Sequence, residues 1–235
     1  MCIGFNELIV MFLSVGCAAL ALAAVRLGAQ ALVTLCVLYA VFMNVFVCKQ
    51  ILLFGWESSA ADALSMGAAL SINLLREFHG AQQARQAIWL SAAGGFCCSG
   101  VASLILLMTP SPSDLAHPAL LQIWSATPRI LVASIGSFLL CEFLEVRAYG
   151  WLQRRWHSHP WVGRHLLCTG GSQILDTLLF TVIGLYGVVS PLLEIGCVSL
   201  VIKFFVLVST GPLLLLSRWI LPSEGYVSLR NSASV

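Results

Sequence analysis

The stretch Thr169–Phe180, T-G-G-S-Q-I-L-D-T-L-L-F, places Asp176 inside an otherwise uncharged run. On a helix, Thr169, Gln173, Asp176 and Phe180 recur at intervals of three and four residues and therefore share one face. A carboxylate near the middle of a membrane is costly unless it faces a cavity, a partner charge or a permeation path. The stretch therefore predicts either such a path or a buried polar lock between helices.

The composition of the whole chain agrees with a membrane location. Of 235 residues, 59% are hydrophobic and 9% are charged, whereas soluble domains are about one-quarter charged. We therefore expect a single integral membrane domain over residues 1–235. The net charge of +2 is small and scattered, which argues against a nucleic-acid surface.

The nine cysteines lie mostly inside apolar runs, without a C-x-x-C pair or histidines at metal-ligand spacing. They are expected to act as small hydrophobic residues. His157 and His159 belong to a basic loop rather than to a metal site, so the sequence predicts neither a metal nor a cofactor.

Seven apolar runs are long enough to cross about 30 Å of hydrocarbon. They predict an all-α, polytopic transmembrane helix bundle of six or seven spans, at residues 5–25, 30–53, 60–77, 87–108, 128–149, 167–187 and 192–220. The second run is interrupted by Asn44 and Lys49, and the last by Lys203 and a Gly211-Pro212 break, so either is expected to be a discontinuous helix. The Pro- and Ser-rich segment 109–128 is expected to be an external loop.

The basic residues predict the orientation of the chain. Arginines occupy alternate connections and the C-terminal region, at positions 26, 76, 85, 147, 154, 155, 164, 218 and 230. With seven spans, the positive-inside rule places the N-terminus outside and the C-terminus in the cytoplasm.

Two further spans carry polar faces. Asp62, Asn73 and Glu77 share about a third of the circumference of the third span. The fifth span begins at Arg129 and ends with the stripe Glu142, Glu145 and Tyr149. Two carboxylates one turn apart in a low-dielectric site repel each other, so at least one is expected to carry a proton or to neutralise a cationic ligand.

Six acids lie at or near membrane depth, against three bases. The acids are Asp62, Glu77, Glu142, Glu145, Asp176 and Glu194, and the bases are Lys49, Arg129 and Lys203. A path lined in this way favours a cation. The alternative is that the three bases pair with particular carboxylates and hold the bundle together. Asp62, Glu194 and Lys203 are assigned to such structural or coupling roles.

No nucleophile-elbow, zinc-protease or P-loop motif occurs in the chain. The sequence therefore favours a transporter over an enzyme.

The order and spacing of the polar residues resemble a known family. The motifs are Asn44-x4-Lys49-x4-Phe54-Gly55, Asn73-x3-Glu77-x2-Gly80-x3-Ala84-Arg85, Arg129-x3-Ala133-Ser134-x7-Glu142-x2-Glu145, Arg164, Gln173-x2-Asp176-Thr177-x2-Phe180, and Glu194 with Lys203. Over about residues 40–216, this pattern is similar to the queuosine-precursor transporters, the YhhQ-type vitamin uptake group.

The resemblance implies import of a 7-deazaguanine (queuine, preQ1 or preQ0) across the bacterial inner membrane, for salvage into tRNA modification, without ATP hydrolysis by the chain. We expect Asp176 and one of Glu142 or Glu145 to bind the purine edge and its amine. Amide contacts are assigned to Gln173 and Asn44, and stacking on the ring to Phe180, Tyr149 or Trp56. The remaining substrate contacts are assigned to Asn73, Glu77, Lys49 and Arg129.

The chain departs from the family pattern at three positions. Family members commonly carry Asp at position 73, Gln at 142 and Asp at 145, where this chain has Asn73, Glu142 and Glu145. The additional charge at position 142 favours the amine-bearing queuine or preQ1 over the neutral nitrile preQ0.

Two other functions stay open. The first is a substrate-binding subunit of an energy-coupling-factor vitamin transporter, which takes its ATPase from other chains, since Ala19-x3-Ala23 offers a small-residue helix face to a partner. A membrane-embedded enzyme using Asp176, Glu142 and Glu145 is the second alternative.

The sequence leaves the energy source of transport open, because proton coupling and facilitated diffusion are equally compatible with the polar residues. The expected partners are the bilayer, the 7-deazapurine and a second copy of the chain in a homodimer.

Overall fold

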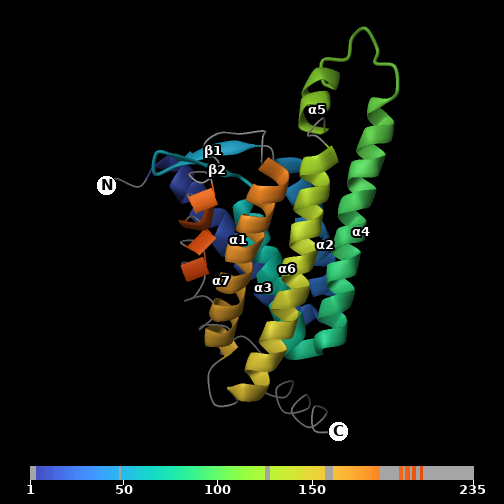
Figure 1. The fold of residues 1–235 in the computed structure, drawn as a ribbon. Coiled ribbons are helices and arrows are strands. Elements are labelled where there is room, and N and C mark those ends of the chain that lie inside the picture. The colour runs from blue at the N-terminus through green and yellow to red at the C-terminus, as the bar shows by residue number, and fades with distance from the viewer. Residues whose placement is uncertain are drawn as a thin grey trace.

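The computed structural model describes residues 4–47, 49–124, 128–156, 161–185, 196–197, 199–201, 203–204 and 207–208. Long helices lie side by side in one bundle (Figure 1). Their bounds are α1 Phe5–Leu27, α2 Ala29–Phe46, α3 Asp62–His79, α4 Ala81–Leu106, α5 His117–Trp124, α6 Pro128–Arg155 and α7 Trp161–Phe180, followed by a π-helical turn η1 at Thr181–Leu185. The prediction of an all-α membrane bundle is confirmed.

Within the part of the chain that the structure describes, four helical segments are both long enough and apolar enough to cross a membrane. They are Phe5–Leu27, Ala29–Phe46, Ala81–Leu106 and Gly163–Gly184. The more polar α3 and α6 have 18 and 28 residues and run among these helices, so their polar side chains can be shielded from lipid. Most of the expected last span, 192–220, lies outside the described residues.

The second predicted span is shorter than expected. Helix α2 ends at Phe46, and strands β1 Gln50–Leu53 and β2 Trp56–Ser59 form an antiparallel hairpin in which Gln50 pairs with Ser59. The chain reverses at Phe54 and Gly55, whose φ angles of 55° and 85° suit a two-residue hairpin turn. The prediction of helix up to residue 53 is therefore wrong.

The connection between α4 and α6 also differs from the expected loop. Part of it, His117–Trp124, forms the short helix α5, and the Asp114 carboxylate accepts hydrogen bonds from the backbone N–H groups of Ala116 and His117. This capping satisfies N–H groups that a helix start leaves without partners. The segment is thus a loop that contains one helix.

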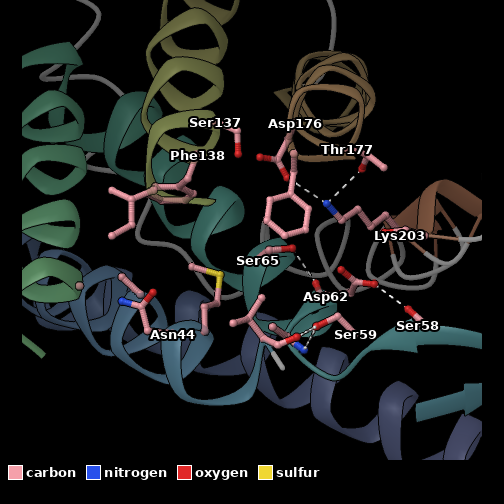
Figure 2. Close-up of a pocket in the computed structure, with 18 of the residues that line it drawn as sticks. Asn44, Ser58, Ser59, Asp62, Ser65, Ser137, Phe138, Asp176, Thr177 and Lys203 are labelled. Carbon is pink, nitrogen blue, oxygen red and sulfur yellow. Dashed lines mark hydrogen bonds and ion pairs between the residues drawn. The ribbon is translucent and has the colours of Figure 1, made fainter. Parts of the chain in front are cut away.

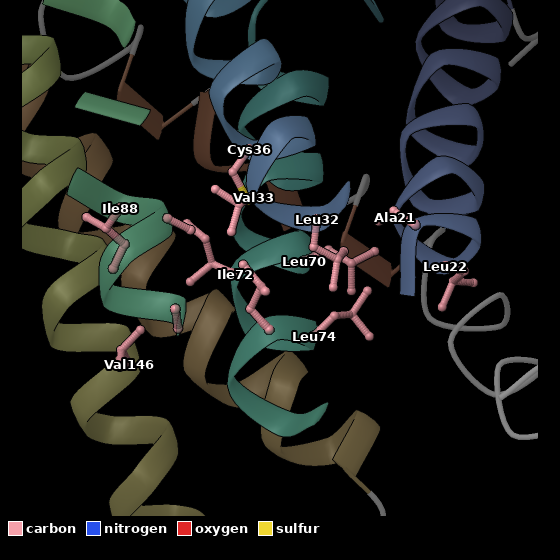
Figure 3. Close-up of a cluster of buried hydrophobic side chains, with 14 of the residues drawn as sticks. Ala21, Leu22, Leu32, Val33, Cys36, Leu70, Ile72, Leu74, Ile88 and Val146 are labelled. Carbon is pink, nitrogen blue, oxygen red and sulfur yellow. The ribbon is translucent and has the colours of Figure 1, made fainter. Parts of the chain in front are cut away.

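Helix α3 lies at the centre of the bundle. It contacts α1, α2, α4, α6 and α7, and its residues 66–75 are buried without interruption. Figure 3 shows Leu70, Ile72 and Leu74 of α3 among Leu32 and Val33 of α2. This apolar packing on several sides holds the polar residues of α3 inside the protein.

Single glycines reverse the chain between neighbouring helices. Gly28 separates α1 from α2 and Gly80 separates α3 from α4, with φ angles of 99° and 89°. Side-chain-bearing residues rarely adopt such angles. The helices on either side can therefore pack as immediate antiparallel neighbours.

The two ends of the bundle differ in charge. The hairpin and α5 lie at one end, here named the hairpin end (Figure 1). The α3–α4 turn, the last turn of α6 and the first turn of α7 lie at the other, here named the basic end because it carries Arg76, Arg85, Arg154, Arg155 and Arg164.

Close packing at Gly67 of α3 leads to a first prediction. A Cβ atom at Gly67 would lie 2.9 Å from the Cβ of Cys17 and 3.2 Å from the ring of Tyr39. Gly67→Val should therefore destabilise the protein by about 1–3 kcal/mol through overpacking. The measurement is thermal unfolding of the detergent-purified protein. The matched control is Gly100→Val on α4, where no atom lies within 4 Å of the added Cβ, and equal destabilisation by both would contradict the prediction.

Candidate functional site

A cavity of about 380 Å³ lies inside the bundle toward the hairpin end. Its walls come from α2, the hairpin, α3, α4, α6, α7 and η1, together with Ser199 and Lys203. Most of its polar groups are hydroxyls, and its lining includes Ser58, Ser59, Ser65, Ser91, Ser137, Thr177, Thr181 and Ser199, the charged Glu57, Asp62, Asp176 and Lys203, the amides Asn44 and Gln50, and the rings of Phe138 and Phe180. Three carboxylates against one ammonium give the described walls a negative excess, which favours a cationic or amine-bearing ligand.

Asp176 and Lys203 form an ion pair at the edge of this cavity. The Lys203 Nζ atom lies 3.0 Å from Asp176 Oδ2 and donates a second hydrogen bond to Thr177 Oγ1 at 3.2 Å (Figure 2). The Lys203 side chain is buried, whereas the Asp176 side chain keeps 21% of its surface exposed. Lys203 therefore pairs with a carboxylate, as the alternative role for the three bases predicts. Asp176 nevertheless still borders the cavity.

Asp62 joins the hairpin to the cavity wall. As the first residue of α3, it accepts a hydrogen bond from the hydroxyl of Ser58 on β2 at 2.7 Å, and Ser65 donates to its backbone carbonyl (Figure 2). Both Ser58 and Asp62 are buried. Asp62 was assigned a structural or coupling role, and the structure places its side chain at the cavity.

A second polar group, here named the buried network, consists of Asn73, Glu145, His165 and Thr169. The Asn73 amide nitrogen lies 2.5 Å from Glu145 Oε1 and 2.9 Å from both Thr169 Oγ1 and His165 Nδ1, and the Thr169 hydroxyl donates to Glu145 Oε1 at 2.6 Å. All four side chains are buried. None of them lines the cavity, although Glu145 also borders a shallow, mainly apolar groove between α6 and α7.

A third polar group, here named the clamp, lies nearest the basic end and consists of Glu77, Tyr149, Gln153 and Arg164. Arg164 Nη2 lies 2.8 Å from Glu77 Oε1, with side chains only 4% and 5% exposed. Tyr149 and Gln153 donate to the other oxygen of Glu77, at 2.9 and 3.3 Å, and the Arg164 guanidinium lies 5.8 Å from the centre of the Tyr149 ring. The clamp ties α3, α6 and α7 together by charge-assisted hydrogen bonds, which are the stronger kind.

The three groups form successive levels along the same helices. On α3, Asp62 lines the cavity, Asn73 belongs to the network and Glu77 belongs to the clamp. At 1.5 Å per residue, Asn73 lies roughly 16 Å and Glu77 roughly 22 Å from Asp62 along the helix axis. Helix α7 contributes Asp176, Thr169 and Arg164 in the same order. The interior therefore contains a column of polar groups from the hairpin end to the basic end.

The structure distributes the predicted site residues among these levels. Asn44, Asp62, Asp176, Phe180 and Lys203 line the cavity, Asn73 and Glu145 belong to the network, and Glu77 and Tyr149 belong to the clamp. Glu142 and Gln173 are buried beside the network. The predicted single site is thus divided, and the Tyr149 ring that was expected to stack on substrate packs against Arg164.

Other predicted residues lie elsewhere. Lys49, expected at membrane depth or its edge, is exposed beside the hairpin, and Trp56 is 52% exposed and does not line the cavity. Both positions follow from the early end of α2, which leaves Lys49 outside the helix and places Trp56 at the start of β2. Glu194 and the side chain of Arg129 lie outside what the structure describes.

Several polar residues at these levels were not predicted. Ser58, Ser59, Thr177 and Thr181 at the cavity are small hydroxyl residues that also occur in ordinary helices and turns. His165 of the network has a stronger signal, because it lies four residues before Thr169 and so extends the polar face of Thr169–Phe180 by one turn.

Comparison with known proteins supports one family. Residues 59–217 match the family described as "Putative vitamin uptake transporter". The chain belongs to this family. Within the vitamin uptake transporter family, the matched region contains the buried network, the clamp and the cavity wall from Ser59 onward, and it excludes α1, α2 and β1.

A curated relative extends the comparison. The chain is 27% identical over 185 residues to a protein of Bacillus subtilis (strain 168) named "Probable queuosine precursor transporter", and the alignment covers 77% of this chain and 80% of the relative. No solved structure matches. Family membership and apolar helices together identify a multi-pass membrane protein of a transporter family.

Proposed function

We propose that the chain imports a queuosine precursor, a 7-deazaguanine, through the polar column of the bundle. The observation that carries this proposal is the cavity inside the membrane helices, which combines carboxylates, hydroxyls, two amides and aromatic rings. Small-molecule sites typically occupy about 300–1,000 Å³, so a cavity of about 380 Å³ suits a bicyclic base. The name of the Bacillus subtilis relative supports the same class of cargo.

The cavity residues suit the hydrogen-bonding edge of a 7-deazaguanine. Its N1–H and exocyclic amine are donors that a carboxylate accepts side by side, and Asp176 or Asp62 supplies that carboxylate. The amide of Asn44 serves the carbonyl of the base. Asn44 and Phe138 lie across the cavity from Lys203 (Figure 2), so a base held between them would have polar and aromatic partners on different sides.

Charge favours the amine-bearing precursors. The described cavity wall has Glu57, Asp62 and Asp176 against Lys203, and a protonated amine on preQ1 or queuine would neutralise part of this excess. The nitrile of preQ0 brings no positive charge. We therefore expect preQ1 or queuine to be preferred.

The orientation follows from the charge difference between the two ends. By the positive-inside rule, the arginines at the basic end support an orientation in which that end faces the cytoplasm of a bacterial inner membrane. The cavity then lies toward the outside, and the clamp closes the column toward the cytoplasm. Import requires the clamp to open after substrate has bound, as in alternating access.

The proposal is tested in a bacterium that can neither make queuosine precursors nor import them. Expression of this chain alone should restore queuosine-modified tRNA when queuine or preQ1 is supplied, and labelled precursor should enter cells unchanged. A requirement for added ATPase subunits would favour the energy-coupling-factor alternative. Chemically altered cargo in proteoliposomes would favour a membrane-embedded enzyme, and failure to transport any precursor would reject the proposal.

Aromatic stacking in the cavity gives a second prediction. If Phe180 stacks on the base, Phe180→Leu removes about 1–3 kcal/mol of binding and should raise the apparent KM for uptake by about 5- to 150-fold. The matched control is Phe96→Leu on α4, where the side chain is exposed on the outer surface and lines no cavity. Equal KM values for wild type and Phe180→Leu would remove Phe180 from the proposed site.

A further inference from the structure

Glu142 and Glu145 of α6 form no ion pair with any described lysine or arginine. Among the described residues, the recorded ion pairs are Lys203–Asp176 at the cavity and Arg164–Glu77 in the clamp. Glu142 and Glu145 lie between these pairs on α6, and both side chains are only 2% exposed. Their charge is therefore not balanced by any described lysine or arginine.

Oxygen atoms around these carboxylates also lack hydrogen-bond donors. Glu145 Oε1 accepts from Asn73 and Thr169, whereas Glu145 Oε2, Glu142 Oε2, Asn73 Oδ1 and Gln173 Oε1 are buried without any hydrogen-bond partner. All four are acceptors, supplied by α3, α6 and α7. A buried acceptor without a donor costs about 1–3 kcal/mol of folding free energy. A bound proton or cation near these oxygens would remove part of that cost.

A proton is the ligand that this arrangement suits. A carboxylate in a low-dielectric interior without a partner charge is neutralised by protonation in preference to remaining ionised. A metal ion would need several closely placed ligands, and the described residues contain no group of three or more His, Cys, Asp or Glu side chains suited to hold one. The neighbouring amide and hydroxyl groups of Asn73 and Thr169 can donate to a carboxylate that has lost its proton.

We propose that Glu142 and Glu145 together form a proton-binding site, distinct from the substrate cavity, through which one proton moves inward with each substrate molecule. This proposal rests on the proposed transport function. One carboxyl O–H bond forms when the site faces the hairpin end, and the same bond breaks when the proton leaves toward the basic end. No other reactant is required.

The position of the pair explains how protonation and transport are linked. It lies between the cavity, which Asp176 of α7 lines, and the clamp, which joins α3, α6 and α7 near the basic end. Among the described residues, the titratable groups near the pair are Cys36 of α2, Cys141 of α6, and His165, Cys168 and Asp176 of α7. Because Asn73 and Thr169 bind Glu145 across helix boundaries, loss or gain of its proton changes the contacts by which α6 holds α3 and α7.

The experiment uses the purified full chain in proteoliposomes with labelled preQ1 as the probe and with the membrane potential clamped at zero. Two quantities are measured: counterflow without any gradient, and accumulation driven by an inward proton gradient. With one proton per substrate, a gradient of one pH unit drives about tenfold accumulation. A pH-sensitive dye inside the vesicles reports proton entry on addition of preQ1.

The expected result separates the pair from the cavity. Wild type should show counterflow, gradient-driven accumulation and preQ1-dependent proton entry. Glu142→Gln and Glu145→Gln, which keep side-chain shape, should keep counterflow and lose both accumulation and proton entry. Asp114→Asn, which also replaces a carboxylate with an amide but at an exposed position between α4 and α5, should behave as wild type.

Each other outcome has a definite meaning. Wild-type counterflow without proton-driven accumulation, or accumulation driven by a sodium gradient instead, overturns the proton site and leaves the transport function standing. Gradient-driven accumulation that survives in both Glu variants also overturns the site. Absence of counterflow with preQ1, queuine and preQ0 rejects the transport function and the proton site together.

Discussion

Asp176→Asn is expected to abolish precursor uptake and to destabilise the protein, and Lys203→Met in the same chain should restore the stability alone. In Asp176→Asn, Lys203 stays buried without its partner 3.0 Å away. Breaking a buried ion pair from one side costs about 3 kcal/mol, whereas replacing both charges is often neutral. If Asp176 also binds the base, uptake should stay lost in the double variant because no carboxylate replaces it.

The measurements are thermal unfolding of the detergent-purified protein and uptake of labelled preQ1 at equal membrane expression. Thr177, which also accepts a hydrogen bond from Lys203, provides a control: Thr177→Val should weaken stability less than Asp176→Asn because it removes no charge. Recovery of uptake together with stability in the double variant would show that the ion pair only holds α7 to the 203 region. Asp176 would then have no place in the substrate site.

Arg164→Ala is expected to give the largest loss of stability among the arginine variants. It removes the guanidinium that lies 2.8 Å from Glu77, donates to the backbone carbonyl of Trp156 at 3.2 Å and packs on Tyr149. Removing one member of a fully buried pair costs about 3–5 kcal/mol. Uptake should fall as well, because the clamp is the contact that closes the column at the basic end.

Exchange of the two charges tests the clamp directly. Arg164→Glu and Glu77→Arg should each be strongly destabilising, whereas the double exchange restores an attractive pair and should recover part of the stability. Arg155→Ala at the exposed end of α6 is the matched control and should leave thermal unfolding unchanged, since surface charges contribute little. No recovery in the double exchange would show that the partners of Arg164 other than Glu77 carry its effect.

Asp176 illustrates how far sequence reasoning reaches. The cost of its charge in an apolar run indicated a cavity or a partner charge, and the structure contains both: the cavity wall and Lys203. Glu142 and Glu145 illustrate where it stops. Their spacing on one helix face was visible, but their separation from the cavity depends on which level of α3 and α7 lies opposite them, and no pattern within one helix contains that information.

The hairpin is a similar case. Residues 51–53 are apolar enough to extend the second span, but α2 ends at Phe46. The structure instead reverses the backbone at Phe54 and Gly55, where Glu7 of α1 accepts a hydrogen bond from the Phe54 N–H at 2.6 Å. This reversal brings Ser58 and Ser59 to the cavity and leaves Lys49 and Trp56 exposed. A contact between residues 7 and 54 is not encoded in either segment alone.

The amino-acid sequence by itself determined that this chain is a helical membrane protein, which residues share a helix face, and that arginines collect in alternate connections. These properties are local, because hydrophobic transfer and helical periodicity depend on residues close together in the chain. The tertiary structure alone decided that the acids divide into a cavity, a buried network and a clamp. That division depends on the rotation and axial register of α3, α6 and α7 against one another, which are set by packing between residues far apart in the chain.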